Sequence, residues 1–461
     1  MSLSHALGAE ALLGPRLEQR ILPGLDRMRR ALEALGRPER SFPSALIVGT
    51  NGKGSTAVLL AEILRAHGLR VGLYTSPHLI EVEERVRIDG MMIPRSRLGE
   101  LVAPLERFPD LSYFETLTCA AVLEFAERRV DIAVMEAGLG GRWDAASAVE
   151  PEVTLLTNVG TDHQQWLGTT RAAIAAEKAA ALRGREAIVG VWDHEVEPVV
   201  RASAAPGTPL SLASAWATVI PIEPRSEEPR VKSEELKRKH QAGVSELLTL
   251  NSQLSTAPRT VEPLNPRTFE RTRVTFTVGG ASGDANLPLA GEHQRANLTL
   301  ALAGAAALAK HGFIRGLRTD AARRGIEGVS WPGRLQWCQG RGRDLLVDGA
   351  HNREAVAALA GALDSMGLSG SVHLLFSCLD DKPLKAMAAI LRPRVRGVTV
   401  APIASPRATP LNDLAAAFPG SQRAGSVAAA LLEIPTDCPT LVTGSLRLAG
   451  EVLASLGGDH G

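Results

Sequence analysis

The chain has 461 residues, which is enough for two or three domains of ordinary size. Hydrophobic residues make up 45% and charged residues 22%, a globular composition that excludes a largely disordered chain. Lysine and arginine number 51 against 50 acidic residues, so the net charge of +1 gives no electrostatic reason to expect a nucleic-acid partner or a membrane surface.

The four cysteines are widely separated and form no CxxC pair. This spacing disfavours a zinc site or a disulfide framework and suits a reducing cytosol. The N-terminal region has no visible signal peptide, and the longest apolar run, 298–309, is too short to span a bilayer. We therefore expect a cytoplasmic protein.

The first elements in chain order predict a strand, a loop, a helix and a second strand. Ser44–Gly49 reads as a short buried strand, and the glycine-rich stretch 49–56 follows it. Apolar residues at helical spacing then run from Ala57 to His67, with Gly68 where a helix would end. The stretch 70–76 is strand-like again.

The same alternation recurs further along the chain. Strand patterns occupy 131–136, 153–158 and 187–191, and helical patterns lie between them. Alternating strands and helices are typical of a parallel sheet with helices on both faces. The fold class predicted for this N-terminal part is therefore α/β.

Residues 202–270 differ, because prolines stand among serine, glutamate and lysine. We expect a variable, partly flexible surface segment there, with one helix at most. After it, 272–278 reads as a strand and 297–310 as a buried, alanine-rich helix.

A second alternating unit begins near Trp331. Strand patterns occupy 344–348, 372–377, 397–400 and 440–443, and 353–363 reads as a helix. This pattern predicts a smaller, Rossmann-like α/β domain. We place the boundary in 325–332, which gives an N-terminal domain of 1–328 and a C-terminal domain of 332–461.

The glycine-rich stretch 49–56 predicts a phosphate site, because it stands between a strand and a helix whose backbone N–H groups favour anions. Gly52 and Gly54 let the backbone approach a phosphate closely, and Lys53 supplies a charge. Ser55 or Thr56 offers a hydroxyl to magnesium. The alternative is a tight glycine turn without a ligand.

Polar residues follow several of the predicted strands. Glu136 ends one strand, and His163 comes shortly after another, so both are expected at the carboxyl edge of the sheet, where ligands bind. A carboxylate suits magnesium, although an acid that caps a turn is the plain alternative. Glu177 and Lys178 read, by themselves, as an ordinary surface pair on a helix that starts near Thr170.

Two residues of the second unit have the same placement. Asp348 ends a predicted strand and suits a ribose hydroxyl or an ammonium group, and Arg334 is a fork-shaped donor suited to phosphate. Either residue alone could equally serve a turn.

Taken together, these motifs resemble the folylpolyglutamate synthase and dihydrofolate synthase family, a branch of the Mur ligase superfamily. The matching stretches occur in the family's order and span nearly the whole chain: 49–55, 74–79, 84–88, 114–118, 136–142, 157–163, 167–170, 176–179, 291–297, 331–335, 348–352 and 443–446. One departure is Trp143, where the family commonly has leucine.

The resemblance implies an N-terminal P-loop, Mur-ligase-type ATPase domain and a C-terminal glutamate-ligase domain. The activity it implies is an ATP-dependent amide ligase. ATP phosphorylates a substrate carboxylate, and the amine of L-glutamate attacks the acyl phosphate. The acceptor is dihydropteroate, a reduced folate, or both, and the bacterial-looking composition favours one bifunctional enzyme.

The resemblance also assigns site residues. It implies catalytic roles for Lys53, Lys178 and His351, with Lys178 as the lysine that this superfamily carbamylates. It implies magnesium ligands at Ser55, Glu136 and His163. ATP contacts fall on Thr50, Asn51, Gly52, Lys53, Gly54, Ser55, Thr56, Asn297, Arg334 and Asp348, and substrate contacts on Ser76, Pro77, His78, Phe114, Asp144, His351 and Ser445. The family is mostly monomeric.

Two other classes of function compete with this interpretation. One is a ligase of peptidoglycan precursors, but those enzymes usually carry an additional N-terminal domain, and here the phosphate loop begins near residue 49. The other is a P-loop switch ATPase, which would not need the polar residues of the second unit.

Overall fold

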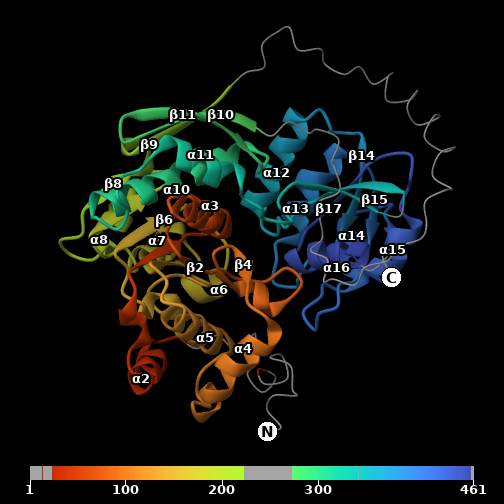
Figure 1. The fold of residues 1–461 in the computed structure, drawn as a ribbon. Helices are drawn as coiled ribbons and strands as arrows, with labels where there is room; N and C mark the ends of the chain where they lie inside the picture. Colours follow the sequence, from red (N-terminus) through yellow and green to blue (C-terminus); the bar gives the residue numbers. More distant parts are fainter. Residues whose placement is uncertain (1–12, 14–22, 223–271, 341, 458–461) are drawn as a thin grey trace, which may run out of the picture.

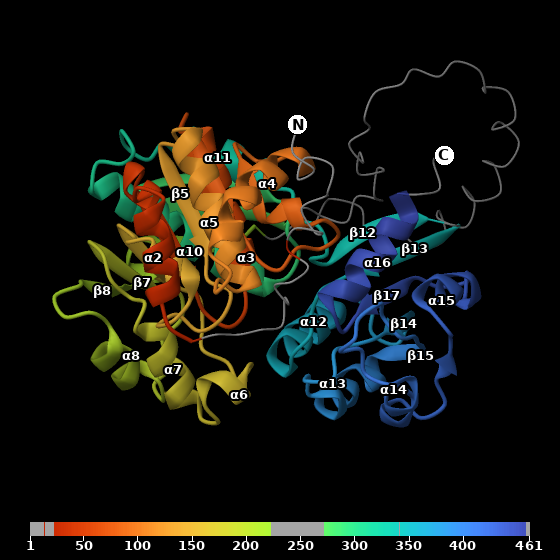
Figure 2. The same ribbon diagram turned by 90° about the horizontal axis from the view of Figure 1, so that it is seen from below.

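The computed structural model describes residues 13, 23–222, 272–340 and 342–457. Within these residues the chain forms an eight-stranded, a three-stranded and a six-stranded sheet. Figures 1 and 2 show the elements up to α11 gathered on one side of the molecule and α12 to α16 on the other. No helix in the described ranges is long and apolar enough to cross a membrane.

The first sheet has the strand order β4-β3-β2-β5-β1-β6-β7-β8. Its strands are β1 Ser44–Val48, β2 Val71–Tyr74, β3 Val86–Ile88, β4 Met91–Met92, β5 Ile132–Glu136, β6 Val153–Leu156, β7 Glu186–Val189 and β8 Leu210–Leu212. In the part of this order that runs from β2 through β5, β1, β6 and β7 to β8, neighbouring strands pair in parallel. At the other edge β3 pairs antiparallel with β2 and with β4.

Helices flank this sheet, and a small antiparallel sheet in the order β11-β10-β9 packs beyond one layer of them. The helices are α2 Asp26–Ala34, α3 Lys53–Ala66, α4 Arg95–Val102, α5 Tyr113–Glu127, α6 Gln164–Leu167, α7 Arg171–Ala179, α8 Glu197–Ser203, α10 Glu292–Lys310 and α11 Thr319–Glu327. The strands of the small sheet are β9 Ala217–Pro221, β10 Thr272–Val278 and β11 Ala281–Leu287.

Strand β1 shows why this arrangement is stable. Ala45 and Ile47 point into a core that contains α3, α10 and α11, and Leu46 and Val48 point into a second core with α2 and α5. Successive strand side chains face opposite sides of a sheet, so a strand with helices on both faces is apolar throughout. All five residues of β1 are buried.

The C-terminal sheet has the order β12-β13-β17-β14-β15-β16, parallel except for the β12 edge. Its strands are β12 Gln336–Gly340, β13 Arg343–Val347, β14 Val372–Phe376, β15 Val395–Val400, β16 Gln422–Arg423 and β17 Thr440–Thr443. Its helices are α12 Arg353–Ser365, α13 Leu384–Leu391, α14 Leu411–Ala417, α15 Val427–Glu433 and α16 Leu446–Gly457.

The predicted α/β class and the strands 272–278 and 440–443 are confirmed. Two predictions are corrected. The helix expected from Ala57 begins at Lys53, because Gly52 has φ 83° and takes the N-cap position. The expected surface segment already contains β8 and β9 between 202 and 222, and 223–271 lies outside the described residues. The boundary at 325–332 falls between β11 and β12 and stays a prediction.

The layered packing generates a prediction about stability. Leu302 lies in α10, fully buried between the two N-terminal sheets, whereas Leu432 in α15 is 65% exposed. Leu302→Ala should lower the free energy of unfolding by about 2–5 kcal/mol, since it removes buried methyl groups and leaves a cavity. Leu432→Ala is the matched control and should change it by less than about 0.5 kcal/mol. Urea denaturation measures both, and equal losses would contradict the packing described here.

Candidate active site

The loop from Gly49 to Gly52 connects β1 to the N-terminus of α3. A Cβ atom at Gly52 would lie 2.3 Å from Asn297 Oδ1, so only glycine lets the loop and α10 approach this closely. A Cβ at Gly54 would lie 3.3 Å from Glu136 Oε2 and 3.0 Å from the ring of Trp331. The loop therefore has the close clearance that a phosphate cradle needs, with an acid and an amide beside it.

Two lysines contact the carbonyls of this loop. Lys53 Nζ donates to the Thr50 carbonyl at 3.2 Å, and Lys178 Nζ donates to the Gly49 carbonyl at 2.8 Å. The interpretation of Lys178 as part of a surface pair is wrong, because Lys178 is only 2% exposed. Burial, and to a smaller extent the charge of Lys53, lowers the pKa of Lys178 to about 7. Glu177, its neighbour, pairs with Arg142 at 3.0 Å.

Glu136 stands at the end of β5, as the sequence predicts, and is 4% exposed. Its Oε2 accepts the backbone N–H of Ser76 at 3.0 Å. Burial raises the pKa of this carboxyl, whereas Lys53 opposes the rise. The strand order places β2, β5 and β1 side by side, which brings Ser76, Glu136 and the phosphate loop to one edge.

Residues 161–163 lie where the two halves of the chain meet. Asp162 Oδ1 accepts from Lys382 Nζ at 3.0 Å, and its Oδ2 accepts from Asn352 Nδ2 at 3.1 Å. Asp162 Oδ2 also lies 3.6 Å from His351 Nε2. Burial acts to raise the pKa of Asp162, but His163 and Lys382 outweigh it and the net shift is downward.

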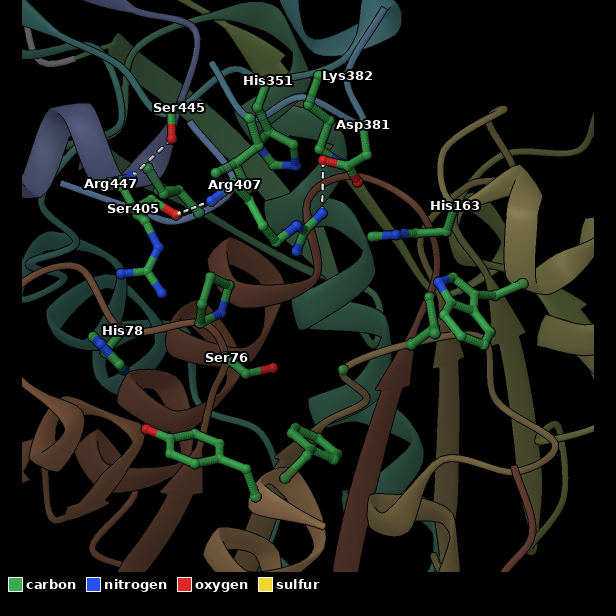
Figure 3. A pocket seen from close by; sticks show the side chains of 18 of the residues that line it. Ser76, His78, His163, His351, Asp381, Lys382, Ser405, Arg407, Ser445 and Arg447 are labelled. Atoms are coloured by element: carbon green, nitrogen blue, oxygen red, sulfur yellow. Dashed lines mark hydrogen bonds and ion pairs between the residues drawn. The ribbon is translucent and has the colours of Figure 1, made fainter. Parts of the chain in front are cut away.

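His163 faces the C-terminal half across the cavity (Figure 3). It adopts φ 60°, an unusual backbone conformation for a residue with a side chain. Burial lowers the pKa of His163 to about 4, so its ring is neutral at pH 7 and able to bind a metal.

Further contacts connect the halves directly at the phosphate loop. Asn352 Nδ2 donates to Asn51 Oδ1 at 2.9 Å, and Thr161 Oγ1 donates to Glu354 Oε1 at 2.6 Å. Thr50 Oγ1 accepts the N–H of Gly160 at 2.9 Å. The loop is thus supported from both halves of the molecule.

Arg334 and Asp348 lie on the C-terminal side. Asp348 accepts the N–H of Leu335 at 3.0 Å and that of Ala350 at 2.9 Å, one on each carboxylate oxygen. Arg334 is buried, which lowers the pKa of its guanidinium. Arg334 Nη1 donates to the Gly333 carbonyl at 2.9 Å, so both side chains are held in place by backbone groups.

A cavity of about 980 Å³, lined by residues of both halves, lies between them. Its lining includes every residue for which the sequence predicts a substrate contact, together with His163: Ser76, Pro77, His78, Phe114, Asp144, His351 and Ser445. Figure 3 shows Ser76 and His78 on one side of this space and His351 and Ser445 on the other. The cavity therefore joins residues that are far apart in the sequence.

Burial and local hydrogen bonds fix the positions of several of these side chains or shift their pKa values. Asp144 accepts backbone N–H groups from Leu139 at 2.7 Å and Ala146 at 3.0 Å, and burial raises its pKa to about 6. His78 Nδ1 accepts from Arg85 Nε at 3.0 Å. Ser55 is 2% exposed in the first turn of α3, and Ser445 Oγ accepts the N–H of Arg447 at 3.1 Å.

Sequence reasoning missed several residues that line the cavity: Arg85, Tyr113, Trp166, Asp381, Lys382 and Arg407. It also named no role for Asp162. Lys382 lies in the loop between β14 and α13, beyond the strand end itself, so the pattern that drew attention to Glu136 and Asp348 does not mark it. Arg407 pairs with Asp381 at 2.8 Å but follows no strand end, so nothing in the sequence pattern marks it.

The described residues do not by themselves supply a complete set of ligands for a metal ion. Among the residues that the structure describes, no three His, Cys, Asp or Glu side chains gather closely enough to hold an ion. Magnesium usually keeps water molecules and takes substrate phosphates beside one or two carboxylates. The buried Glu136, the hydroxyl of Ser55 and the neutral His163 fit that mode, with the phosphate cradle adjacent.

The fold and this site define an ATP-dependent ligase of the Mur type. The profile of the Mur ligase middle domain matches residues 47–193, and that of the Mur ligase glutamate ligase domain matches residues 333–446. The dihydrofolate synthase/folylpolyglutamate synthase of Mycobacterium tuberculosis is 33% identical and covers 90% of this chain and 82% of its own length.

A probable bifunctional folylpolyglutamate synthase/dihydropteroate synthase of Haloferax volcanii is 32% identical over 94% of this chain, which spans only 48% of that relative. Among solved structures, Escherichia coli FolC in complex with DHPP and ADP has a TM-score of 0.79 and 26% identity over the whole of both chains. A bifunctional enzyme with Mn, AMPPNP and L-glutamate bound has a TM-score of 0.75 and 26% identity, covering 98% and 99%.

The chain belongs to the folylpolyglutamate synthase/dihydrofolate synthase family. It is an ATP-dependent glutamate ligase, which sets aside the switch ATPase and the peptidoglycan-precursor ligase.

The ion pair at the junction of the halves generates a prediction. Lys382→Met leaves the buried Asp162 carboxylate without its cation, and separation of the halves is the least costly relief. We expect small-angle scattering to report a larger radius of gyration for Lys382→Met than for the unmodified chain. The double variant with Asp162→Asn should return towards the original value. An unchanged radius in Lys382→Met would contradict a latching role for this pair.

The buried lysine generates a prediction about pH. The pKa of Lys178 falls from its ordinary value of 10.5 to about 7 on folding, so the unfolded chain binds this proton more tightly in that window. The burial of Lys178 therefore lowers the free energy of unfolding, and lowers it by more as the pH falls from 10.5 to about 7. Urea denaturation across this range should show that Lys178→Met loses less stability on acidification than the unmodified chain. Lys385→Met, at an exposed position, is the control and should follow the unmodified chain.

Proposed function

We propose that this enzyme carries out both reactions of its family, joining L-glutamate to dihydropteroate and also to reduced folates that already carry glutamate. The observation that carries the proposal is a continuous cavity of about 980 Å³, which extends from Ser76 and Phe114 to His351 and Ser445. It has room for a planar aromatic acceptor at one end and an amino acid at the other. Similar structures hold DHPP, ADP and L-glutamate.

In this proposal the nucleotide lies on the phosphate loop. Lys53 and the N–H groups of Gly52–Ser55 neutralise the phosphates, and the open N-terminus of α3 adds its dipole. Asn297 stands against Gly52, and Arg334 and Asp348 approach from the C-terminal half. The close clearance at Gly52 and Gly54 supports this role.

Ser55, Glu136 and His163 would hold Mg²⁺. The ion neutralises charge on the transferred phosphoryl group when it is bound. The neutral state of His163 and the buried carboxylate of Glu136 favour these ligands, and a similar structure contains Mn.

Carbamylation of Lys178 is part of the proposal. The reaction requires a neutral amine, and a pKa of about 7 leaves much of the Lys178 amine neutral at physiological pH. The product would be an anion in contact with the phosphate loop. The charge of Lys53 otherwise acts against a second cation at the buried Lys178.

The chemistry is a phosphoryl transfer followed by an acyl transfer. The phosphoryl group passes to the acceptor carboxylate, and the glutamate amine then displaces phosphate. His351 and Ser445 stand at the end of the cavity that would take glutamate. Closer approach of the two halves around bound substrates would limit water, which would otherwise hydrolyse the acyl phosphate.

The domain boundary at 325–332, a monomeric state and a cytoplasmic location are further proposals. All four cysteines are free, which accords with a reducing compartment. The separation of the sheets between Leu287 and Gln336 accords with the boundary.

Incorporation of labelled L-glutamate tests the two activities. The enzyme is supplied with ATP and Mg²⁺, with dihydropteroate in one reaction and tetrahydrofolate in another. We expect incorporation into both. Incorporation into only one acceptor would refute bifunctionality and assign a single activity.

Lys53→Ala tests the phosphate loop. Loss of the charge that faces the phosphates should reduce turnover by at least about a hundredfold, with an unchanged circular dichroism spectrum. Lys385→Ala, on the exposed side of α13, should retain full turnover. Full turnover in Lys53→Ala would remove the role assigned to this lysine.

A further inference from the structure

Trp331 places a buried hydrogen-bond donor beside the phosphate loop. Its indole Nε1 is shielded from solvent and has no hydrogen-bond partner among the residues that the structure describes. An indole N–H can only donate, and buried polar groups in native proteins nearly always have a partner. An unpaired donor at this position therefore suggests that the partner arrives with a ligand.

The geometry shows which side of the ring carries this donor. The position of a Cβ atom at Gly54 lies 3.0 Å from Trp331 Cζ2 and 3.6 Å from Cε2, the carbon bonded to Nε1. The same position lies 3.3 Å from Glu136 Oε2. The Cζ2–Cε2 edge of the ring, which adjoins Nε1, therefore lies against Gly54, and Glu136 Oε2 approaches the same glycine.

The indole is held by its surroundings. Arg87 covers its face, with the guanidinium carbon 5.4 Å from the ring centroid. Arg87 is fixed in turn, since its Nε donates to the Glu84 carbonyl at 3.2 Å. Trp331 also packs against the core between the N-terminal sheets. A ring confined in this way presents its N–H in one direction.

Nearby protein groups do not supply an acceptor. No acceptor among the described residues lies within hydrogen-bond reach of Trp331 Nε1, and the Gly52–Ser55 segment beside the ring offers mainly N–H groups, which are donors. The acceptors that would enter here are phosphate oxygens, which can only accept.

We infer that Trp331 is a nucleotide-binding residue whose indole N–H donates to the phosphate chain held on the 49–56 loop. The inference deepens the proposed function and rests on it, because it requires the nucleotide phosphates at this loop. Trp331 lies between α11 and β12, in the segment that connects the two halves of the chain. The same hydrogen bond therefore connects nucleotide binding to that segment.

Trp331→Phe tests the inference, because it keeps an aromatic ring and removes the N–H. Calorimetric titration with MgADP should show about ten- to a hundredfold weaker binding, the range expected for a hydrogen bond to a charged group. Displacement of a fluorescent nucleotide by adenosine, which has no phosphates, should give the same affinity in both proteins. A ring that only shapes the pocket would weaken both ligands equally, and that result would overturn the inference.

Trp216→Phe is the matched control. Its Nε1 donates to Ser211 Oγ at 2.8 Å, far along the chain from the phosphate loop. This variant should lower the melting temperature of the nucleotide-free protein and leave the MgADP affinity unchanged. Trp331→Phe should weaken MgADP binding, whatever the lost ring packing does to its melting temperature. Weaker MgADP binding by both variants would count against a specific contact at Trp331.

Lys53→Ala separates failure of the inference from failure of the proposed function. If Lys53→Ala binds MgADP as tightly as the unmodified chain, the phosphate loop is wrongly assigned and the inference falls with it. If Lys53→Ala binds weakly while Trp331→Phe binds normally, only the inference is overturned.

Discussion

The ion pair between Asp162 and Lys382 lies at the junction of the two halves, and the architecture of the site depends on it. Both side chains are largely buried, at 9% and 6% exposure, so each charge needs the other. Asn352 joins the same carboxylate and also Asn51 of the phosphate loop. Through these contacts the C-terminal half is held against the phosphate loop, which follows β1 of the N-terminal sheet.

Several ionisable side chains around this junction are buried, and their pKa values are shifted away from the ordinary ones. Lys178 loses affinity for its proton, Glu136 and Asp144 gain affinity for theirs, and His163 becomes neutral. Desolvation is the leading cause in each case. Groups held away from their ordinary protonation states are typical of sites that await a charged ligand. A nucleotide and a divalent ion would supply the missing charges.

Much of the fold could be predicted from local patterns. The strand over 440–443 and the polar strand ends at Glu136 and Asp348 follow from the alternation of apolar strands and helices. Parallel strands of one sheet end at the same edge, so the position of Glu136 beside the phosphate loop was a geometric expectation. Asp348 follows a strand of the other sheet, so its distance from Glu136 depends on how the halves pack. The start of α3 at Lys53 was missed, because apolar periodicity begins only after the polar first turn. The burial of Lys178 was missed because an isolated Glu-Lys pair looks the same on a surface helix and beneath a loop.

The sequence by itself determined the α/β class, the phosphate loop and the family, since each depends on short stretches in which neighbours along the chain suffice. Only the tertiary structure decided which distant residues meet. Arg407 and Lys382 enter the cavity from loops with no distinctive motif, and the unpaired N–H of Trp331 is visible only once Gly54 lies against it. The physical reason is that burial and pairing belong to the packed arrangement of both halves. The groups that shift the pKa of a buried side chain come from distant parts of the chain. The packing that leaves a donor without an acceptor does too, so neither can be read from a local stretch of sequence.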